Sequence, residues 1–204
     1  MVRKLVSTVV ATVFLFGTPI TLAAEREDNE RDRNRDHRED LSWSYLKLSH
    51  LEYDMDIFGV DIEPDGYEVE LALKLGDHLY GFIDRSRAEG DVFGSDYDFD
   101  SEGYGFGWHW DTWFASYSYN TWDLDNNEFD VDTIRFGFRN QWTERIEFNA
   151  SYTWNNIEDA ENDDGFQLGF AFELWDDFNL TSDYETIGGD LDIDTFKVGV
   201  RLDF

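Results

Sequence analysis

Few residues of this sequence have the types and spacing that enzymatic chemistry requires. The chain has no cysteine and four histidines, His37, His50, His78 and His109. No serine stands near a histidine in a spacing typical of a nucleophile and its base, and no zinc-binding pattern occurs. We therefore predict no catalytic residue and no cofactor, with a hydrolase as the alternative.

Carboxylates dominate the chemistry of the chain, which has 46 Asp and Glu against 16 Lys and Arg and a net charge of -30. This charge repels nucleic acid and excludes it as a partner, whereas Ca²⁺ and Mg²⁺ favour carboxylate oxygens. The acids gather in five segments, which we interpret as surface loops, near residues 55–65, 88–101, 123–131, 156–164 and 187–193.

The candidate ligands for a divalent cation are Asp123, Asp125, Glu128 and Asp130. This segment lacks the glycine and the distant glutamate of a calcium-binding loop. The other interpretation is that the acidic segments are only a solvated, repulsive surface.

A second set of charged residues alternates with apolar ones. In residues 195–204 every even position is apolar, whereas Lys197 and Arg201 lie in the odd row. Because side chains alternate across a strand, one face would be apolar and the other polar. The charged residues that we expect to pair on the polar face are Glu68, Glu70, Lys74, Arg135, Arg139, Glu147, Glu173, Lys197 and Arg201.

The elements that would position these charges follow an internal repeat. An acidic residue, then Gly or Thr, then an aromatic residue or Ile recurs at 65–67, 102–104, 132–134, 164–166 and 194–196. Each copy begins an alternating strand, and the first four lead through tight turns to the return strands 79–87, 113–122, 146–154 and 178–186. Together with a strand at 42–53, the count is ten, with eight as the alternative. The facing of 79–87 stays open, with Tyr80 or Phe82 as candidates for the inside.

Aromatic residues near the strand ends indicate a membrane. One group lies toward the tight turns: Trp43, Trp110, Trp113, Trp142, Trp175, Phe178 and Phe204. The other lies toward the acidic segments: Tyr53, Tyr67, Tyr104, Tyr119, Tyr152, Trp154 and Tyr184. Two such levels are typical of the two water–lipid interfaces, and a sheet in hydrocarbon must close on itself. We predict an all-β fold in residues 41–204, a closed antiparallel up-and-down transmembrane β-barrel, with a secreted β-sandwich as the alternative.

The first 40 residues differ in composition from the rest. Residues 1–24 have a basic start, a short apolar run and a small-residue end, which predicts a signal peptide and Sec-type export. Residues 25–40 contain no apolar side chain, which predicts a disordered, charged periplasmic leader.

The signal peptide, the alternating hairpins and the final strand ending in Phe204 resemble the small outer-membrane β-barrel proteins of Gram-negative bacteria, the porin-like and OmpA-type group. The resemblance implies a location in the cell outer membrane, in contact with its lipid and lipopolysaccharide. It also implies that the barrel-assembly machinery recognises the last strand through Phe204. We expect the same strand to close the ring against strand 42–53.

The function that we expect is non-enzymatic: a structural or surface-interaction role with acidic surface loops and candidate binding of Ca²⁺ or Mg²⁺. The alternative is a narrow porin-like channel for small solutes or ions. Side chains fill the interior of barrels of about eight strands, so we expect a mostly plugged lumen at ten.

Overall fold

The computed structural model describes residues 41–57, 60–92, 95–124, 127–157, 162–189 and 191–204. The predicted signal peptide and leader lie outside these residues. The strands are β1 (Tyr45–Ile57), β2 (Val60–Ile62), β3 (Asp65–Lys74), β4 (Leu79–Val92), β5 (Ser95–Trp110), β6 (Trp113–Leu124), β7 (Asn127–Thr143), β8 (Ile146–Ile157), β9 (Asp163–Trp175), β10 (Phe178–Gly188) and β11 (Leu191–Asp203). Among these residues no helix is long and apolar enough to cross a membrane.

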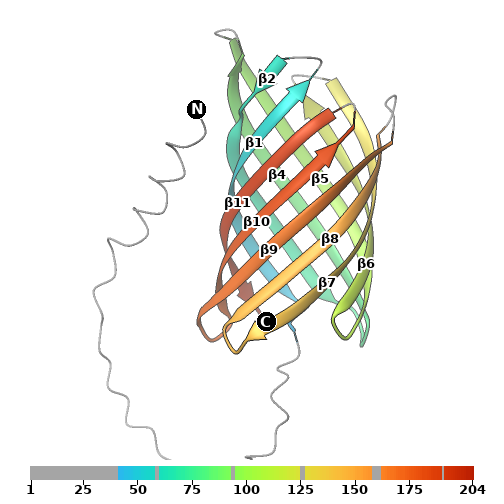
Figure 1. Cartoon of the computed structure of the whole chain (residues 1–204), viewed down its shortest axis with the longest axis vertical. Coiled ribbons are helices and arrows are strands. Elements are labelled where there is room, and N and C mark those ends of the chain that lie inside the picture. Colours follow the sequence, from blue (N-terminus) through green and yellow to red (C-terminus); the bar gives the residue numbers. More distant parts are fainter. Residues whose placement is uncertain (1–40, 58–59, 93–94, 125–126, 158–161, 190) are drawn as a thin grey trace, which may run out of the picture. The chain divides into compact units, whose positions relative to one another are not determined.

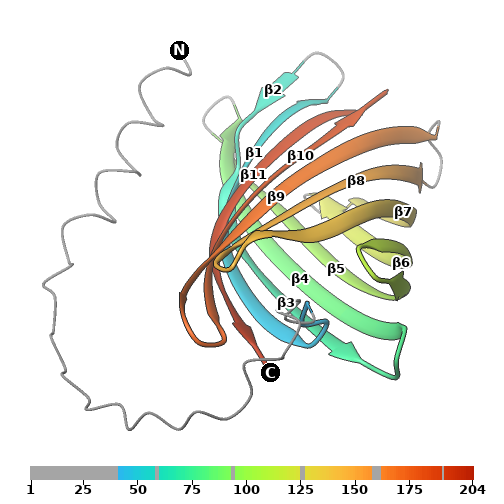
Figure 2. The ribbon, with the colours of Figure 1, turned by 60° about the horizontal axis from the view of Figure 1, so that its bottom comes forward.

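The strands close into one antiparallel ring (Figure 1). Each strand from β3 to β11 pairs with its neighbour in sequence, and β1 pairs with both β3 and β11. The short strand β2 extends β3 beyond Pro64 and also pairs with β1. Pro64 interrupts the two because it has no N–H to donate to the ladder. In the part of the chain that the structure describes, the ring therefore has ten strands, as predicted, and the eight-strand alternative is wrong. Figure 2 shows this ring from the end with the tight turns.

Side chains alternate between the outside and the lumen as the sequence predicts. In β11, Phe196 and Leu202 are exposed on the outside, whereas Thr195 and Arg201 are buried inside. In β4, whose facing was open, Tyr80 points inward and Ile83 outward. Inward glycines of β5 make room for the inward rings of β4, because a Cβ at Gly107 would overlap Tyr80 and one at Gly105 would overlap Phe82.

The polarity of the two faces reverses toward one end of the barrel. Beyond a level marked by Tyr67 and Tyr104, the outward positions become acidic and most inward positions become apolar, as in the pairs Asp54 and Met55 or Asp98 and Phe99. Arg85 and Arg87 are basic exceptions outside. We call this part the collar; it comprises the described positions of 51–66, 85–102, 121–132, 155–164 and 186–195.

The interpretation of the acidic segments as loops is largely wrong, because strands continue through most of them. β5 already begins at Ser95, and β7 begins at Asn127. Acidic residues are rare in strands that face lipid or a core, but here they alternate with apolar residues and face outward. The described positions of the collar therefore belong mostly to regular sheet.

Two aromatic residues predicted for the membrane interfaces instead lie in the lumen. Trp43 is only 6% exposed and lies inside the tight-turn end. Tyr53 points inward and packs edge-on against Phe99, at 5.1 Å between ring centroids. Tyr53 stands at an odd position of β1, whose odd positions face the lumen, so its place could have been read from the alternation. Trp43 precedes the strand and is not covered by this rule.

Candidate functional site

The lumen is the candidate site, and it has three levels along the barrel axis. An apolar cluster occupies the collar, ion pairs cross the middle, and aromatic rings occupy the tight-turn end. Two cavities of about 150 Å³ and 120 Å³ lie within it, and both are lined by Lys47, Glu70 and Arg135. Each is large enough for several water molecules.

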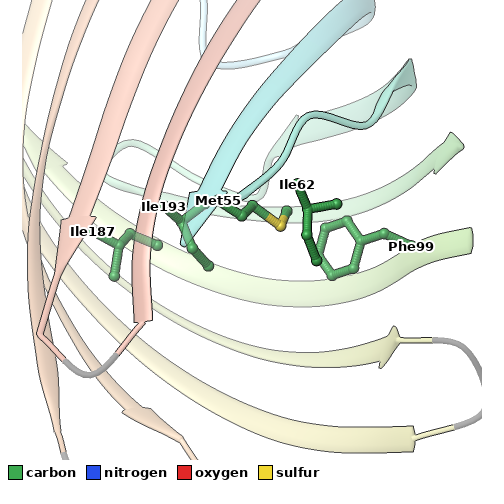
Figure 3. Packing of buried hydrophobic residues seen from close by; sticks show 5 residues of the cluster. All are labelled: Met55, Ile62, Phe99, Ile187 and Ile193. Atoms are coloured by element: carbon green, nitrogen blue, oxygen red, sulfur yellow. The ribbon is translucent and has the colours of Figure 1, made fainter. Parts of the chain in front are cut away.

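The apolar cluster joins strands from opposite parts of the collar (Figure 3). Its buried members are Met55, Ile62, Phe99, Ile187 and Ile193, with Tyr53, Tyr97, Trp122 and Leu124 packed against them. The side chains reach inward from β1, β2, β5, β6, β10 and β11. Above the tyrosine level, the barrel thus has an apolar core and an acidic exterior, as a water-soluble β-barrel does.

Ion pairs connect the walls in the middle of the lumen. The Lys47 ammonium lies 2.9 Å from the Asp183 carboxylate and 3.7 Å from that of Glu70. Lys197 pairs with Glu68 across the β11–β1–β3 ladder. The Arg135 guanidinium on β7 donates a 2.9 Å hydrogen bond to Glu185 on β10. These two strands are not neighbours, so this pair spans the lumen.

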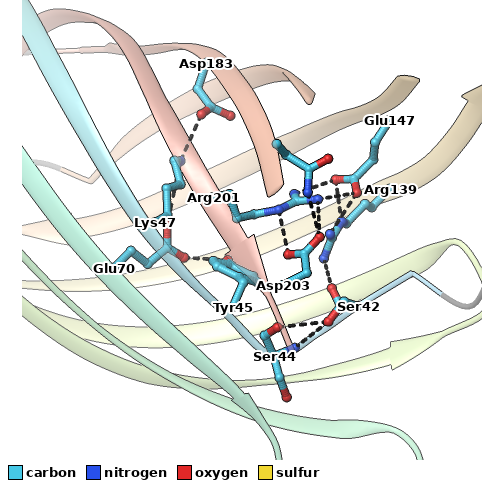
Figure 4. A network of polar contacts seen from close by, with 11 residues as sticks. Ser42, Ser44, Tyr45, Lys47, Glu70, Arg139, Glu147, Asp183, Arg201 and Asp203 are labelled. Carbon is cyan, nitrogen blue, oxygen red and sulfur yellow. Dashed lines mark hydrogen bonds and ion pairs between the residues drawn. The ribbon is translucent and has the colours of Figure 1, made fainter. Parts of the chain in front are cut away.

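A tighter group of charges lies toward the tight turns (Figure 4). Glu147 accepts two hydrogen bonds from Arg139, of 2.6 and 2.9 Å, and two from Arg201, of 3.0 and 2.9 Å. Arg201 also lies 2.9 Å from Asp203. All three members of the Arg–Glu–Arg triad are less than 9% exposed, so their charges are compensated by one another rather than by bulk water.

Most of the charged residues selected from the sequence lie in this network. Glu68, Glu70, Arg135, Arg139, Glu147, Lys197 and Arg201 face the lumen and make ion pairs or hydrogen bonds. Within the described residues, Lys74 and Glu173 make no ion pair. Lys74 is exposed, and its backbone N–H donates to the Ser44 hydroxyl.

Three acidic partners were not selected from the sequence: Asp183, Glu185 and Asp203. Asp183 and Glu185 alternate with Ser182 and Tyr184 in β10, so the period of two could have placed them inside. Asp183 pairs with Lys47 of β1 and Glu185 with Arg135 of β7, strands that are not neighbours of β10, so the sequence alone could not have predicted the partners.

Aromatic rings close around the tight-turn end. Trp43, Tyr80 and Phe114 are buried together, and Phe82 packs against them. The indole ring of Trp43 stacks on His109, with 4.5 Å between centroids and 11° between planes. The Arg139 guanidinium lies 5.0 Å from the Trp43 ring centroid, within range of a cation–π interaction.

The described histidines show no catalytic arrangement. His109 contacts aromatic rings, and His50 lies on the outside, 3.7 Å from Glu52. No hydrogen bond joins a serine to a histidine among the described residues. Among the described residues, therefore, no histidine is hydrogen-bonded to a serine as the base of a nucleophile would be.

The candidate cation ligands lie at the end of the β6–β7 hairpin. Asp123 is opposite Glu128, and Asp130 is opposite Thr121, whose hydroxyl lies 3.4 Å from the Asp130 carboxylate. Asp125 lies outside the described residues. Across the positions that the structure describes, no group of three or more acidic, histidine or cysteine side chains is arranged to hold a metal ion.

No protein-family model matches this sequence, and no curated protein matches it significantly. Among solved structures, it is similar to the translocator domain of the autotransporter NalP from Neisseria meningitidis, with 11% identity, a TM-score of 0.53, and coverage of 83% of this chain and 90% of that one. It is also similar to the β-domain of the Bordetella autotransporter BrkA, with 14% identity, a TM-score of 0.52, and coverage of 79% and 99%. The fold of this chain is therefore the closed antiparallel β-barrel of outer-membrane proteins.

Proposed function

We propose that this chain is a non-enzymatic outer-membrane protein of Gram-negative bacteria, whose acidic collar stands above the membrane as a surface for interaction. The observation that carries the proposal is the reversal of polarity at the tyrosine level. A water-soluble barrel would keep its apolar residues inside along the whole strand. A barrel whose strands extend from the membrane into water instead has apolar residues outside within the lipid and inside beyond the interface.

The outer wall below the collar has the surface that a bilayer requires. Large apolar side chains are exposed there on every side, among them Leu48 at 50%, Phe136 at 49% and Phe170 at 45%. Tyr67 and Tyr104 mark the collar side of this band, and Trp142, Trp175 and Phe204 mark the other. Exposing this band to water would cost about 25 cal/mol for each Å² of apolar area.

The lumen supports a structural role rather than transport. Its collar end holds the apolar cluster, its middle is crossed by ion pairs, and its tight-turn end holds Trp43, Tyr80 and Phe114. An ion would have to pass both the apolar cluster of the collar and the aromatic cluster of the tight-turn end. We expect no steady conductance when the purified protein is added to planar bilayers.

A narrow porin-like channel is the second candidate function. The two adjoining cavities favour it, since together they extend through much of the charged middle of the lumen. Steady single-channel openings in planar bilayers would support the channel and contradict the closed lumen.

The proposed partners follow from this placement. Outer-membrane lipid and lipopolysaccharide surround the apolar band, and the barrel-assembly machinery recognises the last strand at Phe204. Ca²⁺ or Mg²⁺ binds loosely to the acidic exterior of the collar, where Asp123, Glu128 and Asp130 lie close in register.

Cell fractionation combined with gel migration tests the proposed location. The protein should partition with outer membranes, and the unboiled sample should migrate differently from the boiled one, because a closed barrel resists unfolding by detergent. Recovery in the soluble fraction, with identical migration of both samples, would support the secreted β-sandwich instead.

A further inference from the structure

Residues 41–44 precede β1 and fold into the tight-turn end of the lumen. Trp43 of this segment is 6% exposed and is surrounded by aromatic side chains from the strands β4, β5 and β6. It lies 4.5 Å from His109, 4.8 Å from Tyr80 and 5.9 Å from Phe114, measured between ring centroids. Trp43 thus fills the centre of the aromatic cluster, although it belongs to no strand of the barrel.

The segment is held by a few isolated contacts. Arg139 donates a 2.7 Å hydrogen bond to the Ser42 carbonyl oxygen, as Figure 4 shows. The Ser44 carbonyl oxygen accepts a 3.0 Å hydrogen bond from the Phe204 N–H, and the Ser44 hydroxyl accepts one of 2.9 Å from the Lys74 N–H. The pairing of β1 with β3 and β11 begins only at Tyr45. The barrel can therefore stay closed when residues 41–44 leave the lumen.

The smaller cavity borders Trp43. Trp43 forms part of its wall, together with Tyr80, Phe114, Arg139 and Thr181. Tyr80 and Phe114 are fixed on β4 and β6, and their rings lie over the inward glycines Gly107 and Gly137. Among the described aromatic residues of this cluster, Trp43 is the only one that does not belong to a strand.

We propose that residues 41–44 form a plug, and that displacement of Trp43 opens the tight-turn end of the lumen to water and small hydrophilic solutes. This gives the lumen an openable state, which goes beyond the proposed surface role. It does not depend on whether the collar binds a partner. It also does not require conduction through the whole barrel, because the apolar cluster of the collar is a separate constriction.

Cysteine accessibility can test the plug, since the chain has no cysteine of its own. Thr181 lines the smaller cavity, is 4% exposed, and its hydroxyl has no hydrogen-bond partner among the described residues, so Thr181→Cys is a conservative reporter. The rate of labelling by a small water-soluble thiol reagent is measured on the folded full-length protein in detergent micelles. An exposed turn cysteine, Asp77→Cys, gives the rate without protection.

We expect slow labelling of Thr181→Cys when Trp43 is present and labelling at least about tenfold faster with Trp43→Ala. Trp43→Phe keeps a ring in the cluster and should stay close to the slow rate. Trp110→Ala is the matched control, because Trp110 is a tryptophan near the same end that is 40% exposed on the outside. It should leave the labelling rate unchanged.

Two results would overturn the plug. One is a folded Trp43→Ala protein, shown by heat-modifiable migration, that is labelled at the rate seen with Trp43 present. The other is a Thr181→Cys reporter that reacts as fast as Asp77→Cys while Trp43 is in place. If Trp43→Ala does not fold, Trp43→Leu replaces it: faster labelling supports the plug, and an unchanged rate contradicts it.

Discussion

Glu147 compensates two buried arginines at once, which makes it the residue whose charge the lumen can least lose. Glu147→Gln would remove the carboxylate that Arg139 and Arg201 share and leave Asp203 beside Arg201. Removing one member of a buried ion pair costs about 3–5 kcal/mol. We expect a loss of this size in the free energy of unfolding, measured by urea titration of the folded protein in micelles.

Glu102→Gln is the matched control for this prediction. Glu102 lies 3.0 Å from Arg85, but both side chains are more than 60% exposed on the outer wall. Exposed pairs contribute at most about 1 kcal/mol. Equal effects of the two substitutions would show that the buried triad has no special role in stability.

Substitution of Gly107 tests whether the inward aromatic side chains of β4 need the inward glycines of β5. A Cβ at this position would overlap the Tyr80 ring, whereas one at Gly188 would have nothing within 4 Å. Gly107→Ala should cost about 1–3 kcal/mol through overpacking, and Gly188→Ala should have little effect. If thermal unfolding of the two variants is indistinguishable, the tight packing of β4 against β5 is contradicted.

At the scale of the strand, β11 closes the ring. It is paired with β1 from Tyr45 and Asp203 at one end to the collar at the other, and the Phe204 N–H donates to the Ser44 carbonyl oxygen. Deletion of Phe204 should lower the amount of folded protein in the outer membrane, because it removes an outward aromatic ring and the last contact of the closing strand. Quantitative blotting of outer-membrane fractions measures this, and normal levels of the truncated protein would contradict it.

The strands could be predicted from the sequence, but their ends in the collar could not. The alternation of Phe196 with Lys197 correctly indicated an apolar outside and a polar inside. The same rule applied to Asp98-Phe99-Asp100 gives a strand with the opposite polarity, which the acidic composition concealed. The aromatic pattern also predicts Trp43 at the membrane interface, because nothing local shows that a segment before a strand turns back into the lumen.

At the scale of the molecule, the charge is divided unequally between inside and outside. The basic residues of the lumen each have an acidic partner, whereas the collar exterior carries many carboxylates and few bases. Repulsion among these carboxylates opposes folding and would be relieved by the cation binding that we propose. We expect millimolar Ca²⁺ to raise the melting temperature by more than Na⁺ at equal ionic strength, and an equal effect of the two salts would contradict cation binding.

Single cysteines on the outer wall test most directly where the membrane lies relative to the collar. Phe136 is 49% exposed in the middle of the apolar band, and Asp98 has a side chain 59% exposed in the collar. Intact cells carrying Phe136→Cys or Asp98→Cys are treated with a membrane-impermeant thiol reagent. Asp98→Cys should react and Phe136→Cys should not, because lipid covers it. Comparable reaction of both, in protein shown to be folded, would contradict the account.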